Sequence, residues 1–163
     1  MTRDPISEAH RQWVSHGWPD AADGMAMVTS VVRAQQLLME RIDAVLRPRG
    51  LTFARYEVLR LLSFTREAAM PMSRLGSLLQ VHPTSVTSAV DRLVAQGYVE
   101  RVRSESDKRV VRAVLTPAGR EAVEEATTAL NSEVFEAPGL PAGDVRALTE
   151  RLTALRTGLG DGP

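Results

Sequence analysis

The 163-residue sequence contains no cysteine, few aromatic residues (4%) and no long apolar run. Without cysteine, the chain can form no disulfide bond, no thiolate metal site and no cysteine nucleophile. No segment approaches the roughly 18 apolar residues of a membrane-spanning helix, and the first residues lack the layout of a signal peptide, so we expect a cytoplasmic protein. The three histidines lie in no glycine-rich elbow, and no glycine loop that could cradle a phosphate is present. We therefore expect no enzymatic activity and no cofactor.

Net charge is also absent, because 20 Lys and Arg balance 20 Asp and Glu. This balance excludes a uniformly basic surface, but the charges are unevenly placed. Residues 71–120 carry eight basic side chains against four acidic ones, whereas residues 121–163 carry three against eight. A basic middle beside an acidic end favours a polyanion-binding segment joined to a region with another role, with chance clustering as the alternative.

Hydrophobic periodicity predicts a mainly α-helical chain with one small antiparallel β-hairpin. A short helix and a turn are expected within residues 1–24, and residues 70–72 are expected to be extended. The longer helices are expected over about residues 23–46, from Thr52 to about Thr65, from Ser73 to Leu79, from Pro83 to Gln96, over 117–137 and over 142–158, with hairpin strands at 98–103 and 109–115.

The order of elements over residues 73–116 is that of a winged helix-turn-helix. Its second helix starts at Pro83, ends before Gly97 and carries short hydroxyl side chains opposite its apolar face. Slim polar side chains suit a helix that enters the major groove of DNA, and an arginine at a hairpin tip suits the narrow minor groove. Each of these side chains alone is also typical of an ordinary solvent-exposed face, so the combination carries the prediction. The candidate DNA-binding residues are Arg74, His82, Thr84, Ser85, Thr87, Ser88, Arg92, Asp107, Lys108 and Arg109.

Two tracts resemble signatures of the multiple-antibiotic-resistance regulator (MarR) family. The stretch from Pro83 to Leu93, followed by Gly97-Tyr98-Val99, is similar to the recognition helix, and the tract from Asp107 to Thr116 is similar to the wing. The segment Gly50-Leu51-Thr52 leading into Tyr56-Glu57-Val58-Leu59 resembles the first helix of that domain, so the resemblance covers about residues 25–158.

This resemblance implies a transcriptional regulator that acts as a two-fold homodimer on a pseudo-palindromic double-stranded DNA operator. The same resemblance implies that Arg109 reaches the minor groove and that Asp107 keeps Arg109 oriented toward it. The implied regulator is a repressor that a small organic effector releases from DNA.

A division into two functional parts follows, with a DNA-binding domain at residues 51–116 and dimerisation helices at 1–47 and 117–163. The last two helices carry more apolar surface than a small winged domain needs to cover, and their acidic faces would repel DNA. Packing against their own subunit is the alternative. The candidate interface residues are Leu130, Val134, Leu148, Leu152 and Leu155.

Effector residues are expected where the dimerisation and winged parts meet, because MarR-like proteins commonly hold an aromatic or phenolic molecule there. The candidates are Trp13, Trp18, Gln36, Tyr56 and Phe64, with plain core or interface packing as the alternative for each. A metal-responsive winged-helix regulator is the second hypothesis for the whole protein. Its possible ligands are His10 and His16, joined through folding by Glu8 or His82.

Overall fold

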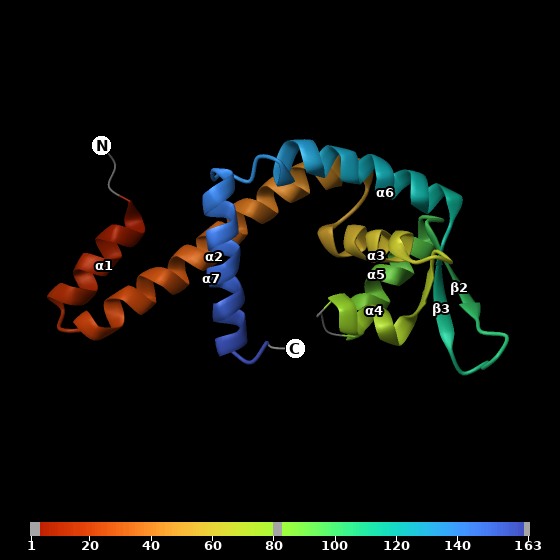
Figure 1. Ribbon diagram of the computed structural model, residues 1–163, viewed down its shortest axis with the longest axis horizontal. Helices are drawn as coiled ribbons and strands as arrows, with labels where there is room; N and C mark the ends of the chain where they lie inside the picture. Colours follow the sequence, from red (N-terminus) through yellow and green to blue (C-terminus); the bar gives the residue numbers. More distant parts are fainter. Residues whose placement is uncertain (1–3, 80–82, 162–163) are drawn as a thin grey trace. The chain divides into compact units, whose positions relative to one another are not determined.

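The computed structural model describes residues 4–79 and 83–161, with only the backbone described at residues 83 and 84. The chain divides into two compact units, Met1–Ala44 and Val45–Pro163. Figure 1 shows the elements in sequence colours. They are α1 (Pro5–Ser15), α2 (Pro19–Leu46), η1 (Arg47–Arg49), α3 (Phe53–Phe64), β1 (Ala69–Pro71), α4 (Met72–Leu79), α5 (Pro83–Ala95), β2 (Val99–Arg103), β3 (Val111–Leu115), α6 (Pro117–Leu130), the π-helical turn η2 (Asn131–Phe135) and α7 (Ala142–Gly158). Within the described ranges, no helix combines the length and the hydropathy needed to cross a bilayer.

The first unit is a helical hairpin of α1 and most of α2. Asp4 caps α1 by accepting the Ser7 backbone N–H at 3.0 Å, as expected for an aspartate before a helix. The chain turns at Gly17, whose φ of 90° favours glycine. The rings of Trp13 and Trp18 then meet edge to face, with centroids 5.7 Å apart. The long helix begins at Pro19, earlier than the sequence pattern predicts, because proline is well accommodated in a first helical turn.

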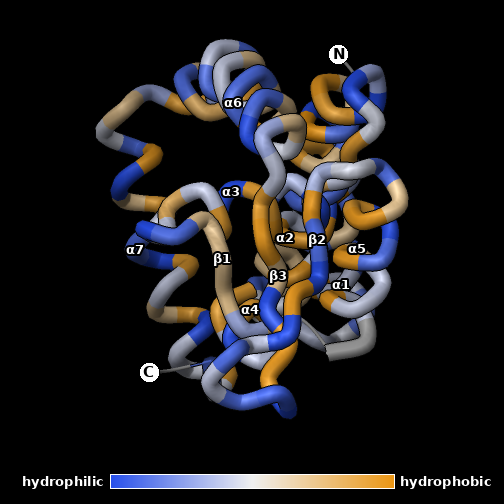
Figure 2. The backbone as a smooth tube through the Cα atoms, turned by 90° about the vertical axis from the view of Figure 1, so that its right-hand side faces the viewer, coloured by the Kyte–Doolittle hydropathy of each residue, from blue (hydrophilic) through white to orange (hydrophobic). Residues whose placement is uncertain are grey.

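The second unit contains a three-stranded antiparallel sheet in the order β1-β3-β2. Ala113 in the central strand lies opposite Met70 of β1 and Arg101 of β2, and it is fully buried. Figure 2 shows β3 between the other two strands, and in Figure 1 the β2–β3 hairpin extends away from α3, α4 and α5. The hairpin is therefore anchored at its base and free at its tip.

The core of the second unit lies between the sheet and helices α3, α4 and α5, which contact one another and the strands. Its fully buried side chains include Val58, Leu59, Leu62, Leu75, Val90 and Leu93. Helix α6 starts against the beginning of β2, where the Thr116 N–H donates to the Tyr98 carbonyl at 3.0 Å. A Cβ at Gly119 would lie 2.1 Å from that same carbonyl oxygen, so this approach requires glycine.

The predicted fold class, a mainly α-helical winged helix-turn-helix with a small antiparallel wing, is confirmed. Two details differ from the expectation. The extended segment near Met70 is a third strand, and the helix expected to end near residue 137 ends at Leu130 and continues as η2. The second compact unit holds both the winged motif and residues 117–163, so compactness alone does not test the functional division. The division into DNA-binding and dimerisation parts therefore remains a prediction about function.

Candidate nucleic-acid interface

Helix α5 has one buried face and one exposed polar face. Val86, Val90 and Leu93 are at most 3% exposed, because they pack toward α3, α4 and β2. The predicted DNA-binding residues Ser85, Thr87, Ser88 and Arg92 are all exposed on the same helix. Arg74, on α4, is also exposed. His82 and the side chain of Thr84 lie outside the described residues.

The wing tip is a tight turn shaped by Asp107. Its carboxylate accepts the backbone N–H of Arg109 at 2.9 Å, and its carbonyl accepts the Val110 N–H at 2.9 Å. Lys108 and Arg109 are exposed. Asp107 thus fixes the backbone turn from which Arg109 projects.

Two arginines of the hairpin are held by carboxylates. Arg101 on β2 donates to Asp91 of α5 at 2.5 Å, and Arg112 on β3 donates to Glu67 at 2.6 Å. The first pair joins the wing directly to α5. Lys108 and Arg109 are exposed cations of the wing-tip turn, whereas Arg101 is paired with Asp91 of α5.

The exposed face of α5 borders an open cleft of about 430 Å³. One wall comes from the start of α3 and the other from α5. The lining residues are Thr52, Ala54, Arg55, Ser85, Ser88, Ala89 and Arg92. The α3 wall was missed in the sequence, although one signal was present: Arg55 places a cation in the first turn of a helix, where the helix dipole disfavours positive charge. A residue that opposes a local preference of its helix, as Arg55 does, often lies at a functional position.

A second, smaller cleft of about 260 Å³ lies between α3, the end of α4 and η2. Tyr56, a predicted effector residue, lines it together with Phe53, Glu57, Arg60, Leu61, Leu78, Leu79 and Phe135. Burial raises the pKa of the Glu57 carboxyl above its usual value. Among the residues that the structure describes, Glu57 has no hydrogen-bond or ion-pair partner.

The other predicted effector residues do not line this cleft. Phe64 is 74% exposed, and its ring lies 5.0 Å from the Arg60 guanidinium carbon. Trp13 is half-buried, Trp18 is 55% exposed and Gln36 is exposed, all within the first unit. The prediction of one pocket built from all five residues therefore stays untested.

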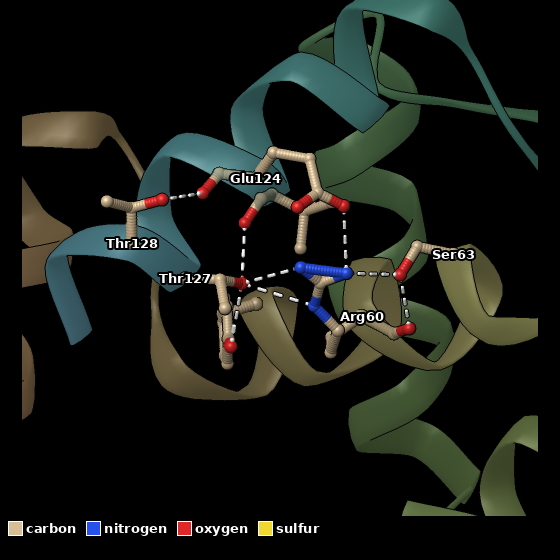
Figure 3. A network of polar contacts seen from close by, with 7 residues as sticks. Arg60, Ser63, Glu124, Thr127 and Thr128 are labelled. Atoms are coloured by element: carbon tan, nitrogen blue, oxygen red, sulfur yellow. Dashed lines mark hydrogen bonds and ion pairs between the residues drawn. The ribbon is translucent and has the colours of Figure 1, made fainter. Parts of the chain in front are cut away.

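A polar network behind the small cleft ties α3 to α6 (Figure 3). The Arg60 guanidinium donates to Glu124 at 3.0 Å, to Ser63 at 2.9 Å and twice to Thr127. The Tyr56 hydroxyl lies 3.0 Å from the same Thr127 hydroxyl. Arg60 is only 15% exposed, so its partners occupy most of its donors. The network leaves no local sign in the sequence, because its bonds between α3 and α6 join residues more than 60 positions apart.

The candidate interface leucines fall into two groups. Leu130 and Val134 are 0% and 3% exposed within the single chain. Leu148 and Leu152 on α7 are 46% and 37% exposed, and Leu155 is half-buried. No residue of α7 is buried, so its apolar side is available to a partner.

The described histidines do not form a cluster that suits a metal ion. Nε2 of His10 lies 2.8 Å from Asp23, and the ring of His16 stacks on Trp18 at 6.2 Å. Across residues 4–79 and 83–161, no three His, Asp or Glu side chains are grouped as metal ligands. Glu8 instead pairs with Arg11.

Comparison with solved structures extends over most of the chain. Sco5413 of Streptomyces coelicolor, a MarR family transcriptional regulator, is 44% identical with a TM-score of 0.76, over 85% of this chain and 96% of that one. Sco3205 of the same organism, a MarR family regulator solved in complex with DNA, is 26% identical with a TM-score of 0.74, over 85% and 88% of the two chains.

Comparison by sequence points to the same family. YhbI of Bacillus subtilis, an uncharacterized HTH-type transcriptional regulator, is 32% identical over 85 residues, which are 52% of this chain and 54% of YhbI. The chain thus spans about half the length of the curated relatives that it matches. The sequence model of the MarR family matches residues 49–110, which hold the winged motif up to the wing tip. Sco5413 is 44% identical to this chain over 85% of its residues. This similarity, together with the match to the family model, shows that the chain belongs to the MarR family of transcriptional regulators.

Proposed function

We propose that this protein is a homodimeric, sequence-specific DNA-binding repressor that a small organic effector releases from its operator. The observation that carries the proposal is the exposed hydroxyl face of α5 in the same unit as the exposed Arg109 of the wing. A helix of this kind reads base edges in the major groove, and a projecting arginine binds the adjacent minor groove. The DNA complex of Sco3205, at 26% identity, supports the same function here.

Dimerisation is supported by apolar side chains that the single chain leaves uncovered. Leu148 and Leu152 lie exposed one helical turn apart on α7. Val28, Val31 and Val32 form a second exposed apolar group on α2. Association of two chains would remove these faces from water, and two recognition helices about 34 Å apart would match one turn of DNA.

An effector site is supported by the small cleft beside Tyr56. Leu78 and Leu79 of this cleft form the end of α4, which precedes the recognition helix in the chain. A ligand that prefers one position of α4 would therefore shift the population between DNA-binding and non-binding forms. Trp13 and Trp18 are the second candidate region for this ligand. As a regulator of transcription, the protein is expected to act in the cytoplasm.

The direct test of DNA binding is a titration of the full-length protein with labelled duplexes from the region upstream of its own gene. We expect binding at least about 10³-fold tighter to one pseudo-palindromic duplex than to a shuffled duplex. Light scattering should give twice the mass of one chain, and Leu148→Arg with Leu152→Arg should give the monomer. Equal affinity for both duplexes, or a monomeric wild type, would contradict the proposal.

Effector binding is tested by a thermal-shift screen with aromatic acids and their thioesters, since a ligand that prefers the folded state raises the melting temperature. A hit should also release the labelled operator. Leu61→Arg, in the small cleft, should abolish this release while operator binding persists. If Trp13→Ala and Trp18→Ala abolish release instead, the site lies in the first unit.

A further inference from the structure

We propose that the larger cleft, between the start of α3 and the exposed face of α5, binds one phosphate of the DNA backbone beside the groove that α5 enters. This proposal rests on the proposed DNA binding and adds a contact from α3, outside the recognition helix and the wing. Its key residue is Arg55.

The side chains around the cleft suit a phosphate. Arg55 and Arg92 supply two guanidinium groups, and Thr52, Ser85 and Ser88 supply three hydroxyls. None of the seven lining residues is acidic. Guanidinium groups bind phosphate oxygens in a bidentate way, and short hydroxyls complete the hydrogen bonds. The apolar part of the lining consists of two alanines, which gives little surface for an organic effector.

Arg55 is held in place before any ligand binds. Its Nε donates to the Thr52 hydroxyl at 3.2 Å, and its Nη1 donates to the Gly50 carbonyl at 3.1 Å and to the Gln96 side chain at 3.2 Å. Gln96 itself donates to the Gly50 carbonyl at 2.8 Å. These bonds leave Nη2 without a partner in the described part of the chain. An arginine fixed in this way loses little conformational entropy when it binds an anion.

Arg92 differs, because it is exposed and has no bonded partner among the residues described. Ser85, Ser88 and Arg92 are spaced three and four residues apart, so they share one side of α5. When that side enters the major groove, the sugar-phosphate strand at the groove edge passes beside it. The Arg55 wall of the cleft then faces this strand, where a phosphate can lie between the two guanidinium groups.

The test uses the full-length protein and the salt dependence of operator binding. Each phosphate contact contributes about one unit to the slope of log affinity against log salt concentration. The proposed homodimer places two such clefts on each operator. We expect the double variant Arg55→Gln/Arg92→Gln to lose about two units of slope, one for each half-site, so that the affinity of the variant falls about 16-fold less than that of the wild type between 50 and 200 mM salt. The double variant Arg146→Gln/Arg151→Gln on α7 removes the same two charges outside the cleft and should leave the slope unchanged.

A loss of about four units would show two separate phosphate contacts in each subunit and would overturn the single site, as would no loss. The double variant should weaken binding to the cognate and the shuffled duplex by the same factor, because a contact to a phosphate does not depend on base sequence. Arg92→Gln alone keeps the test valid if replacement of Arg55 unfolds the protein, because Arg92 supports no other side chain. Failure of the wild type to bind any duplex would instead contradict the proposed function.

A duplex with single neutral methylphosphonates identifies the phosphate and its source. One position in each half-site should weaken wild-type binding, and the same position should have no effect on the double variant. If free inorganic phosphate raises the melting temperature through Arg55 while no methylphosphonate position depends on the cleft, the ligand is a free anion and the proposed DNA contact is wrong.

Discussion

The guanidinium of Arg60 on α3 donates two hydrogen bonds, of 3.1 and 2.9 Å, to the hydroxyl of Thr127 on α6. This contact joins the first helix of the winged motif to the helix that leads toward α7. The Thr127 hydroxyl also donates to the Val123 carbonyl at 2.7 Å, so it both accepts and donates. The contact therefore aligns the DNA-binding part with the proposed dimerisation part.

Thr127→Val should lower the free energy of unfolding by about 1–3 kcal/mol, because Arg60 loses an acceptor in a half-buried place. Thr128→Val is the matched control: it is the same substitution at the next position, where the hydroxyl donates to the Glu124 carbonyl at 3.0 Å and makes no other hydrogen bond to a described residue. Its effect should stay within about 0.5 kcal/mol. Urea denaturation measures both, and equal losses would show that the Arg60 contact adds nothing.

Gly119→Ala should also destabilise the protein, by about 1–3 kcal/mol or more, because the new methyl group would overlap the Tyr98 carbonyl. Backbone has to move to admit it, so α6 would shift from the start of β2. Gly24→Ala in α2 is the control, since a Cβ there meets open space and alanine in a helix interior should stabilise by about 0.5–1 kcal/mol. Thermal unfolding should show a lower melting temperature for Gly119→Ala and a higher one for Gly24→Ala. A higher melting temperature for Gly119→Ala would contradict the close approach of α6 to the Tyr98 carbonyl.

The recognition helix and the wing could be predicted from the sequence because their signals are local. Pro83 and Gly97 mark the two ends of α5, and alternation of residue character marks β2 and β3. The strand β1 gives no such signal, because three residues are too few to show alternation and its partner β3 lies more than 40 positions away. The α3 side of the larger cleft gives only the indirect signal of a cation in a first helical turn, because Arg55 and α5 come together only in the folded chain.

The apolar faces of the C-terminal helices show a different limit of the sequence. Spacing indicates that Leu130 and Leu148 lie on apolar faces, but it does not tell what covers each face. In the structure the chain itself covers Leu130, whereas Leu148 is 46% exposed. Only the second therefore supports an interface with another chain.

Glu57→Gln should stabilise the protein at neutral pH. Burial raises the pKa of Glu57 above its usual value of 4.5, so the folded state favours the protonated carboxyl more than the unfolded state does. The associated stability is present below pH 4.5 and is lost as the pH rises through the raised pKa. Glutamine stays neutral, so its advantage over wild type should grow across that interval and then level off. Urea denaturation from pH 4 to 8 measures the difference, and a pH-independent difference would contradict it.

Arg109→Ala should weaken operator binding by about 1–3 kcal/mol and reduce the salt slope by about two units, one for each wing of the proposed homodimer, if Arg109 enters the minor groove. Asp107 allows the role of the turn to be separated from the role of charge. Asp107→Asn and Asp107→Ala both remove the carboxylate charge, but only asparagine keeps an oxygen that can accept the Arg109 N–H. Because Asp107 bonds the backbone of Arg109, we expect asparagine to bind DNA more tightly than alanine in anisotropy titrations. Equal affinities of these two variants, or tighter binding by the alanine variant, would show that the backbone bond does not matter for the wing.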